Sequence, residues 1–352
     1  MRKSLVSLVS TIAFVFFICS VVSGAEAIKL KVAEFNPATH PTSVLAQKFC
    51  EEVNKRTNGR VELSFYPGGI LLSAPKMFAG VTQGIADIGF SHIAYTRGRF
   101  PVTEIFELPL GFPSSFVASQ AYNDFYENFK PPEWNGVHVF HFYTTAPSLV
   151  QTTSKPIKTL EDLKGAKIRA TGQTSEVVKA LGGTPVPIEM PDLYEALRRG
   201  VIDGAMLDLS PLKYYKFADV MKHVTASWRV GTIYIFYCVM NTNKWNSLPP
   251  DIKKIFTDAA FELREKQVVL WDQMALETRD FFRNQGGQII SLSDAESARW
   301  VNAVEPVIAG YKKEMVSKGY TQAEVDRWLN YIRDRIEYWK KQEKEKGMPT
   351  LF

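Results

Sequence analysis

The feature that most constrains the fold is a repeated alternation between two apolar periods. Over residues 28–32 every second residue is apolar, as in a half-buried strand, and over 45–53 the spacing becomes helical until Asn58 and Gly59 interrupt it. The same two periods then recur as strand, helix and strand over residues 61–65, 77–82 and 85–91. This β-α-β-α-β order predicts an α/β lobe with a mainly parallel sheet.

The pattern starts again in the second half of the chain, after an irregular stretch broken by prolines at 101, 109 and 113. The predicted elements begin with a helix over 118–129 and strands over 137–142 and near 149. A short helix near 160 is followed by strands over 166–170, 184–188 and 204–207, which alternate with helices over 175–181 and 192–199. The last predicted strand runs over 234–240. A chain of 352 residues that is 45% hydrophobic can bury two cores. We therefore expect a two-lobed α/β protein.

The expected domain organisation follows these patterns. Residues 26–150 form a first lobe, to which part of 241–300 returns, and residues 151–240 form a second lobe. Beyond the last strand nearly everything reads as helix, beginning with one long helix over 250–284 that would brace both lobes. We expect residues 250–352 to pack on both lobes.

The N-terminus has the order of a secretory signal. Two cations precede an apolar run, and small residues follow it, so residues 1–25 predict a signal peptide cleaved after Ala25 or Ala27. An uncleaved membrane anchor is the competing interpretation. The later cysteines, Cys50 and Cys238, allow one disulfide, but their apolar surroundings favour two buried thiols.

Charge and motifs exclude several function classes. The formal net charge of +5 is diffuse, and no basic cluster is interleaved with aromatics, so nucleic acid is not an expected partner. The sequence has no G-x-S-x-G elbow, Walker loop or H-E-x-x-H motif, and His138 and His141 would point to opposite faces of a strand. We expect no catalytic residue, no metal site and no cofactor.

The stretch "GAKIRATGQ" places Arg169 at the end of a short apolar strand. A guanidinium in a globular interior needs an acidic partner or water. In a two-lobed α/β protein, strand ends commonly meet at a ligand cleft, where the guanidinium would bind a carboxylate through two parallel hydrogen bonds. An internal salt bridge to an acidic residue of the same lobe is the alternative, and the position alone leaves both open.

Six segments together resemble one known family, the extracytoplasmic solute receptors of tripartite ATP-independent periplasmic (TRAP) transporters of the C4-dicarboxylate-binding type. They are "TNGRVELSFYPGGIL", "GIADIGF", "GRFPVTEIFELP", "LEDLKGAKIRATG", "ALGGTPVPIEMPDLYEALRRGVIDGA" and "VMNTNKWNSLPPDIKKIF". The resemblance runs from about Ile28 to the C-terminus. It implies a periplasmic binding protein of type II-like fold, with hinge strands and a long helix spanning both lobes, that closes on an organic acid.

The resemblance also implies site residues. The carboxylate-binding arginine of the family lies in a K-I-R motif and falls on Arg169. Further pocket positions fall on Phe35, Asn36, Ser91, His92 and Met190, and aromatic candidates for the cleft are Tyr95, Trp228 and Tyr234, with core packing as the alternative for Met190 and the aromatics.

Two departures from the family pattern bear on the ligand. Many relatives carry a second arginine where this chain has Ser148, and an asparagine where it has Leu207. Both changes remove polar contacts, so we expect a monocarboxylate with an apolar or aromatic body, such as a 2-oxo or 2-hydroxy acid. Asp208 is a candidate acceptor for a ligand hydroxyl or amine.

The resemblance implies delivery of the acid to a small and a large integral membrane subunit of the transporter. The protein would be a monomer or a dimer in the periplasm, and not an enzyme. The alternative is a periplasmic module that presents its ligand to a sensor histidine kinase.

Overall fold

The computed structural model describes residues 26–351, so the signal peptide expected over 1–25 lies outside the described residues. The first sheet has the strand order β2-β1-β3-β10-β4. Its strands are β1 (Ile28–Glu34), β2 (Val61–Tyr66), β3 (Ile88–His92), β4 (Val137–Thr144) and β10 (Ile235–Asn241). β1 is parallel to both β2 and β3, whereas β10 is antiparallel to both β3 and β4. One reversed strand therefore interrupts the parallel sheet that the sequence predicts.

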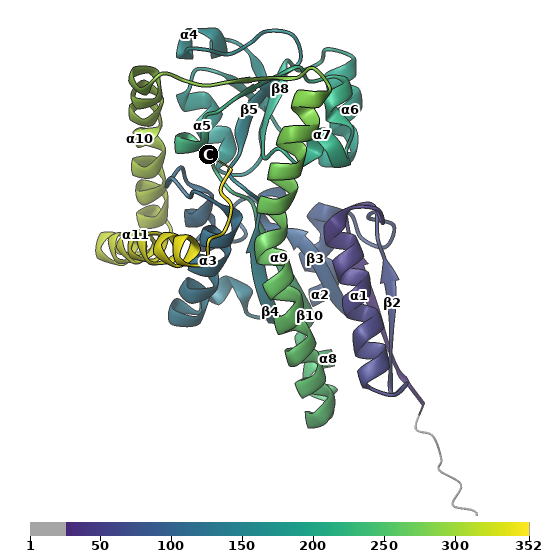
Figure 1. Ribbon diagram of the computed structural model, residues 1–352. Coiled ribbons are helices and arrows are strands. Elements are labelled where there is room, and N and C mark those ends of the chain that lie inside the picture. Colours follow the sequence, from purple (N-terminus) through teal and green to yellow (C-terminus); the bar gives the residue numbers. More distant parts are fainter. Residues whose placement is uncertain (1–25, 352) are drawn as a thin grey trace, which may run out of the picture.

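The second sheet has the order β11-β9-β5-β8-β6-β7. Its strands are β5 (Leu149–Thr152), β6 (Lys167–Arg169), β7 (Thr184–Val186), β8 (Gly204–Leu207), β9 (His223–Thr225) and β11 (Gln288–Ile290). Here β5 is the reversed strand, antiparallel to both β8 and β9, while β6 is parallel to β7 and β8. Each sheet forms the centre of one α/β lobe (Figure 1).

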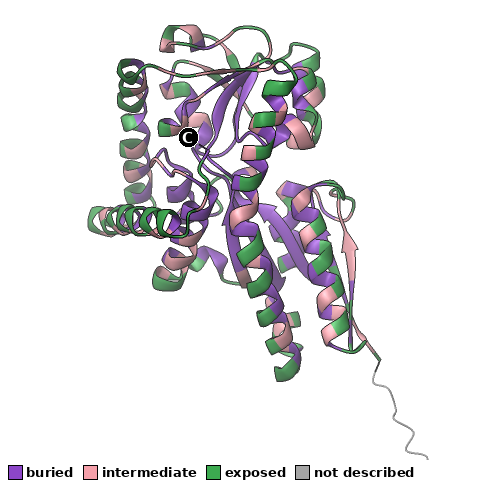
Figure 2. Cartoon of the chain, in the orientation of Figure 1, coloured by how far each residue is buried: buried purple, intermediate pink, exposed green. Residues whose placement is uncertain are grey.

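Helices cover both sheets and extend beyond them. They are α1 (Pro41–Arg56), α2 (Met77–Thr82), α3 (Ser115–Phe129), α4 (Leu160–Leu163), α5 (Thr174–Ala180), α6 (Met190–Arg198), α7 (Pro211–Tyr214), α8 (Thr242–Ser247), α9 (Pro250–Asn284), α10 (Asp294–Ser317) and α11 (Gln322–Glu345). The central strands between them are buried, the edge strands β2, β7 and β11 are only partly buried, and the helices alternate buried and exposed faces (Figure 2). This is the burial pattern that the two apolar periods predict.

One expectation about element placement is wrong. The strand over 234–240, assigned from the sequence to the second lobe, is β10 and lies in the first sheet. The region after it is almost entirely helical, as expected, but it also contributes the three-residue strand β11 to the second sheet, which was not predicted.

Two segments cross between the lobes and bond to each other. Thr145, which follows β4, donates its N–H to the carbonyl of Tyr234 at 3.1 Å, and Ser148 donates to the carbonyl of Thr232 at 2.8 Å. The Tyr234 N–H in turn donates to Oγ1 of Thr145 at 3.0 Å. These crossing segments, residues 145–148 and 226–234, run side by side and connect the two sheets.

The long helix α9 joins the lobes on one face. It contacts α1, α3 and β4 of the first lobe and also α7 and β11 of the second. Figure 1 shows it running past both sheets, from α8 at one end to α7 at the other. Its 35 residues are the span predicted from the sequence.

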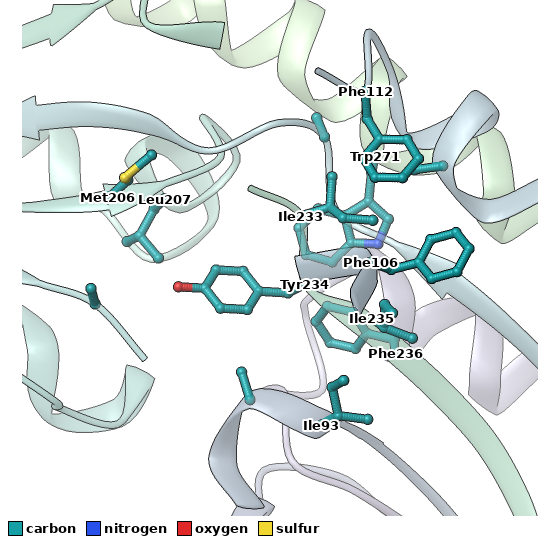
Figure 3. Packing of buried hydrophobic residues seen from close by; sticks show 14 of the residues in the cluster. Ile93, Phe106, Phe112, Met206, Leu207, Ile233, Tyr234, Ile235, Phe236 and Trp271 are labelled. Atoms are coloured by element: carbon teal, nitrogen blue, oxygen red, sulfur yellow. The ribbon is translucent and has the colours of Figure 1, made fainter. Parts of the chain in front are cut away.

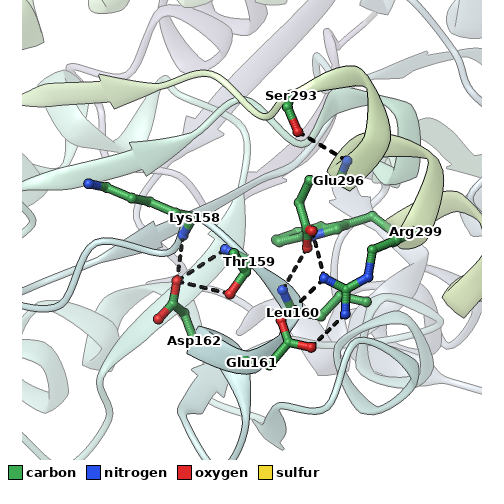
Figure 4. Close-up of polar contacts among 9 residues, drawn as sticks. Lys158, Thr159, Leu160, Glu161, Asp162, Ser293, Glu296 and Arg299 are labelled. Atoms are coloured by element: carbon green, nitrogen blue, oxygen red, sulfur yellow. Dashed lines mark hydrogen bonds and ion pairs between the residues drawn. The ribbon is translucent and has the colours of Figure 1, made fainter.

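The C-terminal helix α10 packs on α4 and α5 of the second lobe, and Figure 4 shows its polar contacts with the start of α4. Glu296 of α10 accepts from the Leu160 N–H at the start of α4 at 2.8 Å and from the indole of Trp300 at 3.0 Å. Arg299 pairs with Glu161 at 2.5 Å and with Glu296 at 2.7 Å. From there α11 returns to pack on α3 of the first lobe.

Candidate functional site

A small cavity of about 30 Å³ lies between the two lobes. It is formed where β1, β3, β6 and β8 end and where the crossing segments and α9 pass. Its lining consists of Phe35, Asn36, His40, His92, Thr145, Arg169, Met190, Leu207, Asp208, Ser210, Pro211, Tyr215, Tyr234, Phe236 and Trp271. Larger hollows exist, such as one of about 380 Å³ between α1 and α9, but six of its ten lining residues carry charges. The cavity between the lobes combines aromatic rings with convergent polar side chains, of which Arg169 and Asp208 are the ones that carry opposite charges, as ligand sites do.

Arg169 closes one end of this cavity. It is the last residue of β6 and is only 1% exposed. Its Nε donates to the carbonyl of Ile188 at 2.8 Å, while Nη2 is buried and has no hydrogen-bond partner. No ion pair among residues 26–351 includes Arg169, so the internal salt bridge that the sequence left open is not formed there. This buried guanidinium therefore lacks the anionic partner that a buried charge requires.

His92 and Tyr95 lie on the same side as Arg169. The rings of His92 and Tyr95 are 4.0 Å apart between centroids, and the Tyr95 hydroxyl accepts from the Met190 N–H at 3.2 Å. Burial, and secondarily the charge of Arg169, lower the pKa of His92 well below its usual value. The imidazole is therefore neutral at physiological pH, and it leaves Arg169 as the cation of this end.

Aromatic side chains form the wall of the cavity (Figure 3). Phe236 of β10 lies between Phe35, at 6.1 Å, and Trp271 of α9, at 5.3 Å, measured between ring centroids. Tyr234 extends from the crossing segment with its hydroxyl directed toward the side of Met206 and Leu207. That hydroxyl is buried without a hydrogen-bond partner. The wall is thus apolar apart from single polar tips.

A hydrogen-bonded chain joins the lobes across the cavity. The Tyr215 hydroxyl, in the second lobe, donates to Oδ1 of Asn36 in the first at 2.7 Å. Asn36 is held in turn by the Glu34 carboxyl, which accepts from its backbone N–H and from Nδ2, each at 3.0 Å. Burial raises the pKa of Glu34 to about 8, so this carboxyl is largely protonated at neutral pH.

Asp208 follows β8 and occupies another part of the lining. Its Oδ1 accepts from the Ser210 N–H at 2.8 Å, at the start of α7. Burial raises its pKa to about 6, which leaves the carboxylate mostly ionised at pH 7.

The structure brings eight of the twelve sequence-predicted site residues to the cavity lining: Phe35, Asn36, His92, Met190, Arg169, Leu207, Asp208 and Tyr234. Tyr95 contacts the cavity only through His92 and Met190. Ser91 faces away, donating to the Ala74 carbonyl at 3.2 Å, and Ser148 is buried in the crossing segment with its hydroxyl unpaired. Trp228 lines a separate hollow beside Arg229 and Ser291, because the chain turns outward after β9.

Sequence reasoning missed seven lining residues: His40, Thr145, Ser210, Pro211, Tyr215, Phe236 and Trp271. Trp271 belongs to the apolar stripe of α9, which reads as ordinary core. Tyr215 lies in "LKYYKF" without any motif. A usable signal existed only for Phe236, two positions after the predicted Tyr234 on the same strand pattern.

Metal binding has no support in the described chain. Residues 26–351 contain no cluster of three or more histidine, cysteine or acidic side chains that could hold a metal ion. Cys50 and Cys238 are buried free thiols, as their apolar surroundings predict. Within the same residues, no helix is both long and apolar enough to span a bilayer.

Comparison with known proteins identifies the family. The model of the bacterial extracellular solute-binding proteins, family 7, matches residues 32–314. The chain belongs to this family. It is therefore an extracytoplasmic solute receptor of the TRAP type and not an enzyme, as the six segments predicted.

Three similar proteins illustrate how far the sequence and the fold agree with this family. The C4-dicarboxylate-binding protein DctB of Bacillus subtilis is 26% identical over 287 residues, 77% of this chain and 79% of that protein. A TRAP periplasmic solute-binding protein from Desulfovibrio salexigens is 36% identical, with a TM-score of 0.76 over 88% of this chain and 96% of that one. A marine metagenome TRAP protein specific for aromatic acids, solved with 3-hydroxybenzoate, is 28% identical, with a TM-score of 0.83 over 89% and 99%.

TRAP solute receptors bind small carboxylates, work with membrane subunits and are periplasmic. The two-lobed fold and the organic-acid class predicted from the sequence are confirmed at this level.

Proposed function

We propose that this receptor captures a monocarboxylic acid with an apolar or aromatic body, and that Arg169 binds the carboxylate. One observation carries the proposal: the buried Nη2 of Arg169 has no partner and its side chain lines a cavity walled by Phe35, Phe236 and Trp271. A carboxylate supplies the missing anion, and the rings supply contact for the remainder of the acid.

The polar groups near Arg169 fit a single carboxylate. His92 is neutral, and the Tyr234 hydroxyl, buried without a partner, is available to donate a hydrogen bond. Elsewhere the lining offers Leu207 and Met190, which suit an apolar body. The aromatic-acid specificity of the metagenome relative agrees with this choice, whereas the dicarboxylate named for DctB requires a second cationic contact that Ser148 does not provide.

Delivery completes the proposed role. The receptor, exported by a signal peptide cleaved after Ala25 or Ala27, passes the acid to a small and a large membrane subunit. We propose that the first lobe is built on the sheet that contains β1, β2, β3, β4 and β10, and the second lobe on the sheet that contains β5 to β9 and β11. The β4–β5 and β9–β10 connections serve as the hinge between them. The sensor role considered from the sequence has no observation in its favour, and we do not propose it.

The test is calorimetry of Arg169→Ala and Arg169→Lys with the acids that stabilise the wild type in a thermal-shift screen. The screen contains aromatic, branched 2-oxo and 2-hydroxy monocarboxylates together with C4 dicarboxylates. Removing one partner of a buried charge pair costs about 2 to 5 kcal/mol, so Arg169→Ala should weaken binding roughly thirtyfold to a few thousandfold. Lysine should restore only part of the affinity, because it lacks the two parallel donors.

Arg199→Ala is the matched control, since Arg199 is an exposed arginine at the end of α6 in the same lobe. Its affinity should match the wild type. Unchanged binding in Arg169→Ala, or tighter binding of dicarboxylates than of monocarboxylates by the wild type, would contradict the proposal.

A further inference from the structure

Asp208 is an ionisable group in the cavity that capture of a carboxylate does not use. It lies one residue after β8, is 3% exposed and lines the cavity. The neighbouring lining residue, Leu207, is apolar. A buried carboxylate at such a place has to be compensated by donors.

The local fold bonds this carboxylate through Oδ1. Oδ1 accepts from the Ser210 N–H at 2.8 Å, an Asx-type turn that leads into α7. The Ser210 side chain also lowers the pKa of the carboxyl against the effect of burial, and no ion pair among residues 26–351 includes Asp208. An asparagine would form the same turn without placing a buried negative charge, so the turn does not explain the carboxylate.

Asp208 and Arg169 do not form an ion pair with each other, although both line one small cavity. Arg169 thus offers a cation to an anionic group of a ligand, and Asp208 separately offers a hydrogen-bond acceptor to a donor group of that ligand. A ligand that brought a second carboxylate to Asp208 would bury two negative charges together, which is unfavourable. A ligand that brought a hydroxyl or an ammonium would instead donate a hydrogen bond to this carboxylate.

We propose that Asp208 accepts a hydrogen bond from a hydroxyl or ammonium group that the ligand carries away from its carboxylate. This inference rests on the proposed function, because Arg169 must orient the acid for its other end to reach Asp208. It makes the receptor selective for donor-bearing monocarboxylates over plain monocarboxylates and over dicarboxylates.

The experiment measures dissociation constants by calorimetry for wild type, Asp208→Asn and Asp208→Ala. The probes are benzoate, 3-hydroxybenzoate, 4-hydroxybenzoate, 4-(aminomethyl)benzoate and benzene-1,3-dicarboxylate. Wild type should bind at least one donor-bearing acid about tenfold or more tightly than benzoate, since a hydrogen bond to a charged acceptor is the stronger kind. The hydroxyl and aminomethyl arms show which donor the site takes.

In Asp208→Ala the ratio between benzoate and the preferred acid should fall to about one. Asp208→Asn keeps an acceptor and the turn to Ser210, so a hydroxyl preference should shrink while an ammonium preference disappears. In both variants, the affinity for benzene-1,3-dicarboxylate should increase relative to the affinity for benzoate. Thermal unfolding checks that the variants fold, and Asp208→Asn carries the test if alanine disrupts the turn.

Asp192→Asn serves as the control, because Asp192 is an exposed aspartate of α6 in the same lobe and its change removes the same charge. It should retain the wild-type ratios. Benzoate binding without any gain from a donor, or a gain that survives in Asp208→Ala, overturns the inference and leaves the proposed function standing. If no monocarboxylate binds the wild type, the proposed function fails and this inference fails with it.

Discussion

At the scale of single residues, the cavity depends on polar atoms placed where apolar packing surrounds them. Arg169, Asp208 and Glu34 are all nearly inaccessible, yet none forms an ion pair in the described chain. Each instead has hydrogen bonds to neighbouring groups, and Arg169 and Glu34 each keep one buried polar atom without a partner. Such groups cost folding free energy, and they are retained where a ligand uses them.

The Tyr215 to Asn36 hydrogen bond gives a first prediction at this scale. Tyr215→Phe removes the hydroxyl that links the lobes at 2.7 Å, so the closed form loses about 1 kcal/mol and ligand affinity should fall roughly fivefold. Calorimetry with the acid selected by screening measures it. Tyr338→Phe, at an exposed tyrosine of α11, is the control and should bind as the wild type does. Equal affinities for the two variants would show that this bond does not favour closure.

Glu34 gives a prediction about pH. Burial raises its pKa from 4.5 to about 8, so between pH 7 and 8 the folded protein holds a proton that the unfolded chain has lost. Glu34 alone then lowers stability by about 1 kcal/mol as pH rises across this interval. The buried histidines, whose pKa values are lowered, act in the opposite direction because the unfolded chain still holds part of their protons at pH 7, whereas Asp272, whose pKa burial raises to about 7, adds to the decrease. The contribution of Glu34 is therefore the difference between the slopes of the wild type and of a variant without this carboxyl.

The measurement is urea unfolding at pH 7 and pH 8 for wild type and Glu34→Gln. The variant should show a flatter dependence and should be the more stable protein, relative to wild type, at the higher pH. Glu62→Gln, at an exposed position of β2, should retain the wild-type slope. A wild-type slope that Glu34→Gln does not change would show that this carboxyl ionises normally in the folded state.

At the scale of elements, close strand contact fixes the position of Asp208. Gly204 begins β8, and a Cβ there would lie 2.1 Å from the Gln151 carbonyl oxygen of β5. Gly204→Ala must therefore displace one strand from the other. We expect a loss of about 1–3 kcal/mol or more in unfolding free energy, with weaker ligand binding because β8 carries Leu207 and Asp208.

Gly310→Ala is the opposite case and the control. Gly310 lies inside α10, and a Cβ there meets nothing within 4 Å. Alanine should raise the melting temperature, corresponding to about 0.5–1 kcal/mol, because glycine is unfavourable in a helix interior. Denaturation of both variants measures the contrast, and a Gly204→Ala protein as stable as the wild type would contradict the close packing of β5 on β8.

Most elements could be predicted because their apolar residues repeat at a helical or strand spacing over enough positions to be recognised. α2, β8 and α9 coincide with their predicted spans, and α1 ends just before Asn58 and Gly59, which adopt positive φ values of 50° and 77°. The short strands β9 and β11 were not predicted, whereas β6 and β7, which are equally short, were predicted because they alternate with the helices α5 and α6. β9 and β11 lack such flanking helices in a regular order, and their pairing partners lie far along the chain.

At the scale of the whole molecule, the proposed capture of an acid between the lobes requires the lobes to move. The polar contacts between them include the Tyr215 bond, a bond of 3.2 Å from the Met190 N–H to the Tyr95 hydroxyl, a bond of 3.0 Å from Gln173 to Glu104, and an ion pair of 3.0 Å between Arg97 and Glu176. The last pair is exposed and contributes little. Closure of this kind is reversible and leaves the ligand to stabilise the closed form.

Ligand should therefore shorten the distance between probes on opposite lobes. Cysteines introduced at Ile70 and Val201, exposed at 75% and 53%, can be labelled selectively because Cys50 and Cys238 are buried. A labelled pair at Ile70 and Ile85, both outside the second lobe, should not respond. Spin-label distance measurements with and without the acid check this, and saturable binding with an unchanged Ile70–Val201 distance would exclude lobe closure.

The sequence by itself determined the elements, the two-lobed α/β class and the presence of one arginine at a strand end that lacked an evident partner. Those conclusions rest on local periodicity and on the chemistry of one side chain. Only the tertiary structure decided that Arg169 forms no ion pair within residues 26–351, that Trp271 and Tyr215 join the cavity and that Trp228 does not. The reason is separation along the chain: Tyr215 and Asn36 are 179 positions apart, and no local pattern encodes which distant side chains meet.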